Sequence, residues 1–178
     1  MDRLRRETGL PTVAVAQAWL DRADLGATLA ALARFDFVRG IRHKPRPGQM
    51  ADVRWLSGFA LLCERGLRFD LQAPWTQLED AAQLALAARP NAALKVSGLG
   101  VPGNTWTAQA NREIVLTAID VFGVGRSMFA SNFPVDGLCA SFDAIVSGLR
   151  EIVRDFRAAE QRAFFHDNAI RIYDMERT

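Results

Sequence analysis

Short apolar segments alternate with longer segments of helical periodicity along this chain. The short segments are rich in β-branched and other apolar residues and cover residues 13–17, 38–43, 68–72, 92–97 and 127–133. Parallel strands need long crossover connections, which are usually helices. The alternation therefore predicts an α/β fold with about five parallel strands and surrounding helices.

The chain length limits how much of such a fold can be present. A complete eight-unit (β/α) barrel takes about 250 residues, whereas this chain has 178. A complete barrel therefore does not fit. The length is typical of one domain, and we expect residues 1–178 to form a single domain.

Apolar residues at helical spacing predict helices between the strand segments. Asp24 is expected to cap the first helix, and Thr76 with Glu79 has the pattern of a capping box. In residues 141–156 the apolar side chains, beginning with Phe142, follow one stripe of a helix. The expected helices cover residues 25–32, 53–65, 76–88, 106–122, 141–156 and 158–175.

Charge balance and cysteine count exclude several classes of function. Lysine and arginine number 22 against 20 acidic residues, which gives no electrostatic argument for binding nucleic acid or an anionic membrane. No stretch approaches the ~18 apolar residues of a membrane span. Cys63 and Cys139 are too few for a disulfide framework, and we expect Cys63 to be a buried, reduced thiol. These features predict a cytoplasmic protein that binds neither nucleic acid nor membranes.

Polar side chains stand at the end of each predicted strand. In parallel α/β folds the loops at the carboxyl ends of the strands converge on one face, where functional sites form. The candidates at these positions are Gln17, Arg42 with His43, Asp70 with Gln72, Lys95 with Ser97, and Asn132 with Asp136.

Two of these positions allow both a functional and a structural interpretation. Arg42 and His43 begin a cationic cluster that can grip a carboxylate or lactone oxygen, or can form an ordinary solvated loop. Asn132, two residues before Pro134, can present a polar group at the functional edge, or can satisfy backbone groups of the following turn. The residues alone leave both alternatives open.

Metal and nucleotide sites have little support in the sequence. The two histidines, His43 and His166, lack the spacing of a metal site, and we expect His166, with Asp167 and Asn168, to tie the terminal helix to a neighbour. Residues 98–103 match the glycine spacing of a dinucleotide-binding loop, but Pro102 removes a backbone donor that a phosphate would need. We expect this segment to be a plain loop.

Five sequence blocks together resemble the amidohydrolase-related TIM-barrel hydrolases, and within them the lactonase-like branch. The blocks are Gly40-Ile-Arg-His43, Phe69-Asp-Leu71, Leu94-Lys-Val-Ser-Gly-Leu-Gly100, Met128-Phe-Ala-Ser-Asn-Phe-Pro-Val-Asp136 and Phe165-His-Asp-Asn-Ala169. They occur in order over nearly the whole chain, and their joint occurrence is specific.

The resemblance implies a (β/α) barrel that hydrolyses a lactone or a related C–O or C–N bond, with a divalent metal, Zn or Mn, in many members. It also implies a His-x-His pair on the first strand, a histidine on a middle strand and an aspartate near the end of the last strand. By this resemblance the chain starts near the family's first helix, so we expect the first strand and its His-x-His pair to be absent. Its blocks abut at Pro90-Asn91, where the family has a further β–α unit, and Asn132 occupies the acidic position. No metal ligands carry over.

We therefore expect an incomplete TIM-type barrel and an impaired hydrolase of a small-molecule lactone, ester or amide. Arg42, His43 and Gln72 are the predicted substrate contacts. Asn132 is predicted to orient the attacking water, and Asp136 is the fallback carboxylate. The alternative is a non-catalytic remnant, or an oligomerising interaction protein, of the same fold.

Overall fold

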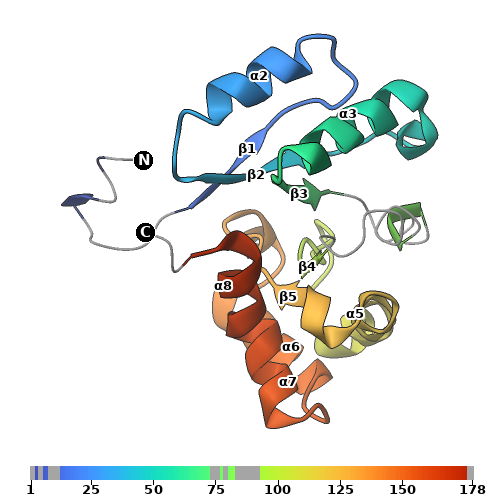
Figure 1. Cartoon of the computed structure of the whole chain (residues 1–178). Coiled ribbons are helices and arrows are strands. Elements are labelled where there is room, and N and C mark those ends of the chain that lie inside the picture. The colour runs from blue at the N-terminus through green and yellow to red at the C-terminus, as the bar shows by residue number, and fades with distance from the viewer. Residues whose placement is uncertain are drawn as a thin grey trace. The chain divides into compact units, whose positions relative to one another are not determined.

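The computed structural model describes residues 3, 6–7, 13–72, 77, 80–82 and 93–175 (Figure 1). The chain divides into two compact units. Unit 1 comprises Met1–Ala92 together with Ile170–Thr178, and unit 2 comprises Ala93–Ala169. The single domain expected over residues 1–178 stays a prediction. Within the described part of the chain, no helix is long and apolar enough to cross a membrane.

Unit 1 is built on a parallel sheet of three strands. They are β1 (Ala14–Gln17), β2 (Val38–His43) and β3 (Arg68–Leu71), in the order β1-β2-β3. The register pairs Gln17 with Arg42 and Arg42 with Asp70. The polar residues predicted at the strand ends therefore form a row across this sheet.

Two helices cover one face of this sheet, α2 (Leu25–Leu32) and α3 (Val53–Glu64), as Figure 1 shows. A short 3₁₀ turn, Gln49–Ala51, precedes α3. The Asp52 carboxylate caps α3 by accepting from the amides of Arg54 and Trp55. The prediction that the Asp24 side chain caps α2 is wrong. This side chain makes no capping hydrogen bond and accepts from Arg22 Nε instead.

The core of unit 1 forms where α2 and α3 meet the sheet. Its fully buried side chains include Leu20, Leu29, Ile41, Trp55 and Leu62. Cys63 was expected to be buried with them, and this prediction is wrong. Leu62 takes the inward position of the helix, and the next residue, Cys63, is exposed.

Unit 2 contains a second parallel pair, β4 (Leu94–Val96) and β5 (Ser127–Phe129). The helix α5 (Ala108–Phe122) and a 3₁₀ turn, Val124–Arg126, connect them. A further 3₁₀ turn, Val135–Leu138, leads to α6 (Phe142–Ile152), whose N-cap is Ser141. Residues 97–107 form the loop that joins β4 to α5.

Several predicted boundaries in unit 2 are wrong. Strand β5 ends at Phe129 rather than residue 133, and Asn132 has a φ of 54°, which no strand residue adopts. The stripe of α6 buries Ile145 and Leu149, but Phe142 is 46% exposed because it lies in the first turn of the helix.

The terminal helix is divided where the sequence predicts one continuous helix. Its parts are α7 (Ala158–Arg162), a π-helical turn (Ala163–Asp167) and α8 (Asn168–Tyr173). The Asn168 amide donates to the carbonyls of Val124 and Ser127, both at 2.8 Å. Asn168 thus supplies the predicted tie, whereas His166 is exposed.

The sequence predicts about five parallel strands with surrounding helices, and the described residues confirm this. The strands belong to a sheet of three and a sheet of two. The helix expected over residues 76–88, its capping box and the Pro90-Asn91 junction lie mostly or wholly outside the described residues.

Gly58 provides a direct test of the packing in unit 1. A Cβ at this position of α3 would lie 1.9 Å from the Leu20 carbonyl oxygen, whereas a Cβ at Gly26 of α2 would meet nothing within 4 Å. We expect Gly58→Ala to destabilise the protein by about 1–3 kcal/mol or more, measured by denaturant unfolding. The matched control, Gly26→Ala, should be neutral or stabilising by up to about 1 kcal/mol. Equal stability of the two variants would contradict this packing.

Candidate functional site

In unit 1, Arg42 and Asp70 are neighbours at the ends of β2 and β3. Arg42 Nη2 lies 3.9 Å from Asp70 Oδ2. The Tyr173 hydroxyl donates to Asp70 Oδ1 at 2.6 Å. Burial and the Asp70 carboxylate raise the pKa of Tyr173, so its hydroxyl stays protonated and remains a donor. The predicted substrate contact Arg42 thus lies beside a carboxylate that a phenol holds in place.

His43, next to Arg42, is 2% exposed. Its Nδ1 accepts from the Leu20 amide at 3.2 Å and from Trp55 Nε1 at 3.1 Å. Burial lowers the pKa of His43 below its usual value, Asp21 opposes this shift, and Arg46 adds to it. The ring is therefore held neutral by its surroundings.

Gln72, the third predicted substrate contact, follows β3. Its backbone amide donates to the His43 carbonyl at 3.0 Å, and its side chain is exposed. Unit 1 thus brings Arg42, His43 and Gln72 to the carboxyl end of its parallel sheet. Their role as substrate contacts stays a prediction.

In unit 2, Asn132 and Asp136 form a hydrogen-bonded pair. Asn132 Nδ2 donates to Asp136 Oδ1 at 2.7 Å, and Asp136 is only 5% exposed. The positive φ of Asn132 is of the kind that asparagine tolerates better than most residues, and it turns the chain directly after β5. The two candidate residues after this strand are therefore in contact, and the Asn132 amide orients the Asp136 carboxylate.

The loop after β4 covers this pair. A Cβ on Gly100 would lie 3.1 Å from Asp136 Cγ and 3.0 Å from Cys139 Sγ, and a Cβ on Gly98 would lie 3.6 Å from Asn132 Nδ2. Gly98 also has a φ of 67°. The glycines that resembled a nucleotide loop thus allow the backbone to approach Asn132 and Asp136. The spacing of these glycines was visible in the sequence, but their partner was not.

Sequence reasoning missed two residues of the unit 1 arrangement. Trp55 was not among the candidate residues, yet its indole nitrogen donates to His43. Tyr173 was not among them either, yet it contacts Asp70, 103 residues earlier in the chain. No local pattern signals a contact of that separation.

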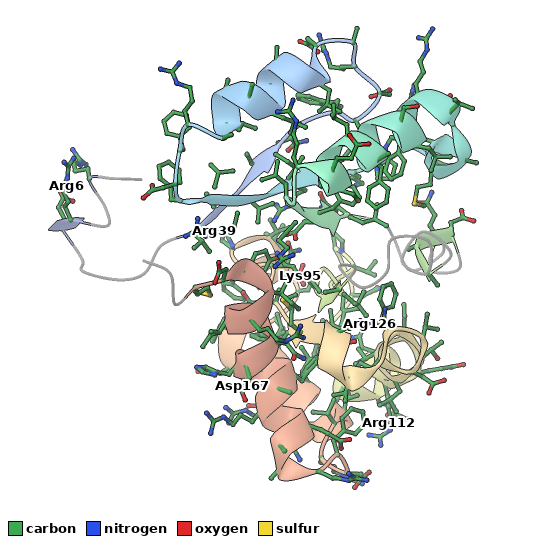
Figure 2. All side chains as sticks on the ribbon, in the orientation of Figure 1. Arg6, Arg39, Lys95, Arg112, Arg126 and Asp167 are labelled. Atoms are coloured by element: carbon green, nitrogen blue, oxygen red, sulfur yellow. The ribbon has the colours of Figure 1, made fainter. Side chains whose placement is uncertain are left out.

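The donor set does not fit the metal site that the resemblance implies. His43 Nδ1 is occupied by two N–H donors, and His166 Nδ1 lies 2.7 Å from Asp167 Oδ1 at the surface, where Asp167 projects outward in Figure 2. Among the residues described, no group of three or more His, Cys, Asp or Glu side chains is placed to hold a metal ion. A catalytic zinc site usually needs three such ligands.

The lowered pKa of His43 predicts how stability depends on pH. The unfolded chain binds a proton near the usual pKa of about 6.5, and the folded chain binds it only at lower pH. The stabilisation is therefore complete above about pH 6.5 and is lost as pH falls through the folded-state pKa. We expect the melting temperature to fall between about pH 7 and pH 5, and to fall less in His43→Asn. In His166→Gln the melting temperature should fall with pH as much as it does in the wild-type protein. Equal slopes in all three proteins would contradict the assignment.

Comparison with known proteins places this fold in a family. A family model described as Amidohydrolase matches residues 81–175. The uncharacterized protein y4mH of Sinorhizobium fredii is 34% identical over 209 residues, covering 93% of this chain and 70% of y4mH. An L-fucono-1,5-lactonase of Burkholderia multivorans is 31% identical over 176 residues, covering 88% of this chain and 58% of the lactonase.

A solved structure shows the same fold. The zinc-bound crystal structure of an amidohydrolase from Burkholderia multivorans has a TM-score of 0.77 and 21% identity, covering 97% of this chain and 76% of that one. The alignment with y4mH, at 209 residues, is 31 longer than the 178 residues of this chain. That relative therefore contains internal residues without a counterpart here, as the expected loss of a β–α unit requires. The chain belongs to the amidohydrolase family and has the fold of an incomplete TIM-type barrel.

Proposed function

We propose that this amidohydrolase hydrolyses a small lactone or a related carboxylic ester or amide. The observation that carries the proposal is the Asn132–Asp136 pair, whose 2.7 Å hydrogen bond orients a buried carboxylate in the segment that follows β5. The similarity to an L-fucono-1,5-lactonase supports a lactone as the substrate. The chain spans 58% of the length of that lactonase.

The pair can activate water without further groups. Asn132 Nδ2 is committed to Asp136, which leaves the amide oxygen to accept a hydrogen bond from a water molecule. Asp136 takes a proton from that water as its oxygen attacks the lactone carbonyl carbon. The tetrahedral intermediate then collapses, the ring C–O bond breaks, and the departing oxygen recovers the proton from Asp136. One water is consumed, and a hydroxy acid is released.

Substrate binding is assigned to Arg42, His43 and Gln72 of unit 1. The Arg42 guanidinium suits a carbonyl oxygen or a carboxylate, because it offers several N–H donors and a fixed charge. Asp70 and Tyr173 limit its movement on the side of β3. We propose that the reaction is impaired, because a single carboxylate activates the water. Both cysteines are free, which supports the proposed cytoplasmic location.

The Asp136 carboxylate can be removed with little change of shape. We expect Asp136→Asn to lower kcat for L-fucono-1,5-lactone, or for the best substrate in a lactone panel, by about 100-fold or more, since general base catalysis contributes about 10²–10⁴. The control is Asp120→Asn, an exposed carboxylate of α5 in the same unit, which should retain full activity. Each protein is assayed with and without added Zn²⁺ or Mn²⁺. Equal rates in the two variants would refute the role of Asp136.

One observation favours the alternative of an interaction protein. The 3₁₀ turn Val135–Leu138 exposes both of its end residues, Val135 at 61% and Leu138 at 78%. The aromatic side chains on either side of the turn, Phe133 and Phe142, are nearly half exposed. The rings of Phe133 and Phe142 lie 5.5 Å apart. Clustered apolar side chains at a surface are typical of contact sites between proteins.

The alternative predicts self-association that depends on Leu138. We expect Leu138→Ser to reduce the concentration-dependent increase in mass that sedimentation or light scattering would show for the wild-type chain. Thr117→Ser, at an exposed position of α5, is the control and should behave as wild type. A wild-type chain that stays monomeric at all concentrations would exclude this oligomer.

A further inference from the structure

The hydrogen bonds of His43 determine which of its ring nitrogens carries the proton. Both the Leu20 amide and the Trp55 indole are donors only, and both point at Nδ1, at 3.2 Å and 3.1 Å. A nitrogen that accepts two N–H groups has no room for a proton of its own. The neutral imidazole must therefore carry its proton on Nε2.

The donor from Trp55 is held rigidly in place. Trp55 is fully buried, its ring stacks on Phe59 at 5.7 Å, and the edge of Phe69 packs against it at 5.8 Å. Its backbone amide donates to the Asp52 carboxylate that caps α3. The indole N–H can therefore not turn away from His43 without disturbing the core of unit 1.

The charged groups around His43 do not favour a second proton. Asp21 and Arg46 act on the ring with opposite signs, and they lie 4.0 Å apart as an ion pair. Strand β1 carries no charged residue, and β3 carries Arg68 and Asp70, which bond to the Ile172 carbonyl and the Tyr173 hydroxyl. Protonating Nδ1 would bring a positive N–H group against two other N–H groups in a buried place, which would cost at least both hydrogen bonds.

The other ring nitrogen is available to a ligand. Within the described part of unit 1, no group accepts a hydrogen bond from His43 Nε2. We propose that Trp55 is a positioning residue which, with the Leu20 amide, holds His43 as the Nε2–H tautomer, so that Nε2–H donates to an oxygen of the bound lactone or its acid. The identity of that ligand rests on the proposed function, but the tautomer does not.

This assignment gives His43 a defined chemical role. An Nε2 that carries a proton cannot ligate a metal ion, and an Nδ1 that accepts two donors cannot act as a general base. What remains is a neutral donor aimed at a carbonyl or carboxylate oxygen, which is the class of group that a lactone and its hydroxy acid share. His43 is thus a substrate-binding donor.

Nitrogen-15 NMR of the full chain tests the tautomer directly. The chain has two histidines, so His43→Asn assigns the His43 signals by their loss, and the exposed His166 remains as the reference. We expect His43 Nδ1 to resonate as an unprotonated nitrogen and Nε2 as a protonated one from pH 8 to pH 6. A protonated Nδ1 in that range would overturn the proposal.

Trp55→Phe tests the positioning role, which a purely structural tryptophan would not have. The phenyl ring keeps most of the packing but removes the indole donor. We expect protonation of Nδ1 to become measurable, with the titration of His43 moving to higher pH. A His43 spectrum and titration identical to wild type in the folded variant would show that Trp55 does no positioning.

Two substitutions of His43 separate the acceptor from the donor, and they apply even where Trp55→Phe does not fold. The amide oxygen of His43→Asn can replace Nδ1 but offers no group at the place of Nε2, whereas the longer His43→Gln can carry a donor there. We expect His43→Asn to weaken binding of L-fuconate, measured by calorimetry, by about 10-fold to 100-fold. His43→Gln should recover part of that loss. Equal binding by wild type and His43→Asn would overturn the donor role.

Failure of the inference and failure of the proposed function give different results. The protein can show a protonated Nε2 by NMR and bind L-fuconate through His43, yet hydrolyse no lactone. This result supports the inference and contradicts the proposed function. A protein that hydrolyses lactones and shows a protonated Nδ1 contradicts the inference alone. Absence of L-fuconate binding by the wild-type chain overturns the donor role for this class of ligand.

Discussion

The pairing of β2 with strands on both sides is the constraint on which unit 1 depends. Ile41 at its centre is fully buried, and the polar residues Arg42 and His43 come directly after it. Gly40 permits the close approach of β3, because a Cβ there would lie 2.8 Å from the Arg68 carbonyl oxygen. Since a shift of one residue would exchange the two faces of the strand, this register decides which side chains meet Asp70 and Trp55.

The strand pattern was predictable because it depends on local composition. The segment 38–43 is short, contains the β-branched residues Val38 and Ile41 and is soon followed by Pro45, and the structure places β2 at the predicted positions. The wrong predictions concern positions where tertiary packing determines which of two similar side chains is buried. Cys63 and Leu62 are both apolar neighbours on a helix, and only the position of the sheet makes one inward and the other exposed. The π-helical turn that divides the terminal helix likewise has no signal in residues 158–175 that we recognised.

The sequence likewise predicts some features of the candidate site and not others. Asn132 and Asp136 could be predicted at the same strand end, because only three residues, Pro134 among them, lie between the two. The hydrogen bond between their side chains was not predicted. The roles of Gly100, Trp55 and Tyr173 depend on contacts between segments that lie far apart in the chain or on different elements. For His43, the sequence indicated a functional histidine. Only the hydrogen bonds at Nδ1 show what kind of function the ring can have.

The hydrogen bond between Tyr173 and Asp70 joins two ends of unit 1 that the whole of unit 2 separates in sequence. During synthesis, chains emerge from the ribosome N-terminus first and fold progressively. Asp70 therefore emerges well before its partner, and its hydrogen bond can form only after Tyr173 has been released. Arg68 waits likewise for the carbonyl of Ile172. The strand end that carries the predicted substrate contacts is completed only when residues 172–173 have been synthesised. A nascent chain that stalled before Ile170 would contain all of unit 2 and only part of unit 1.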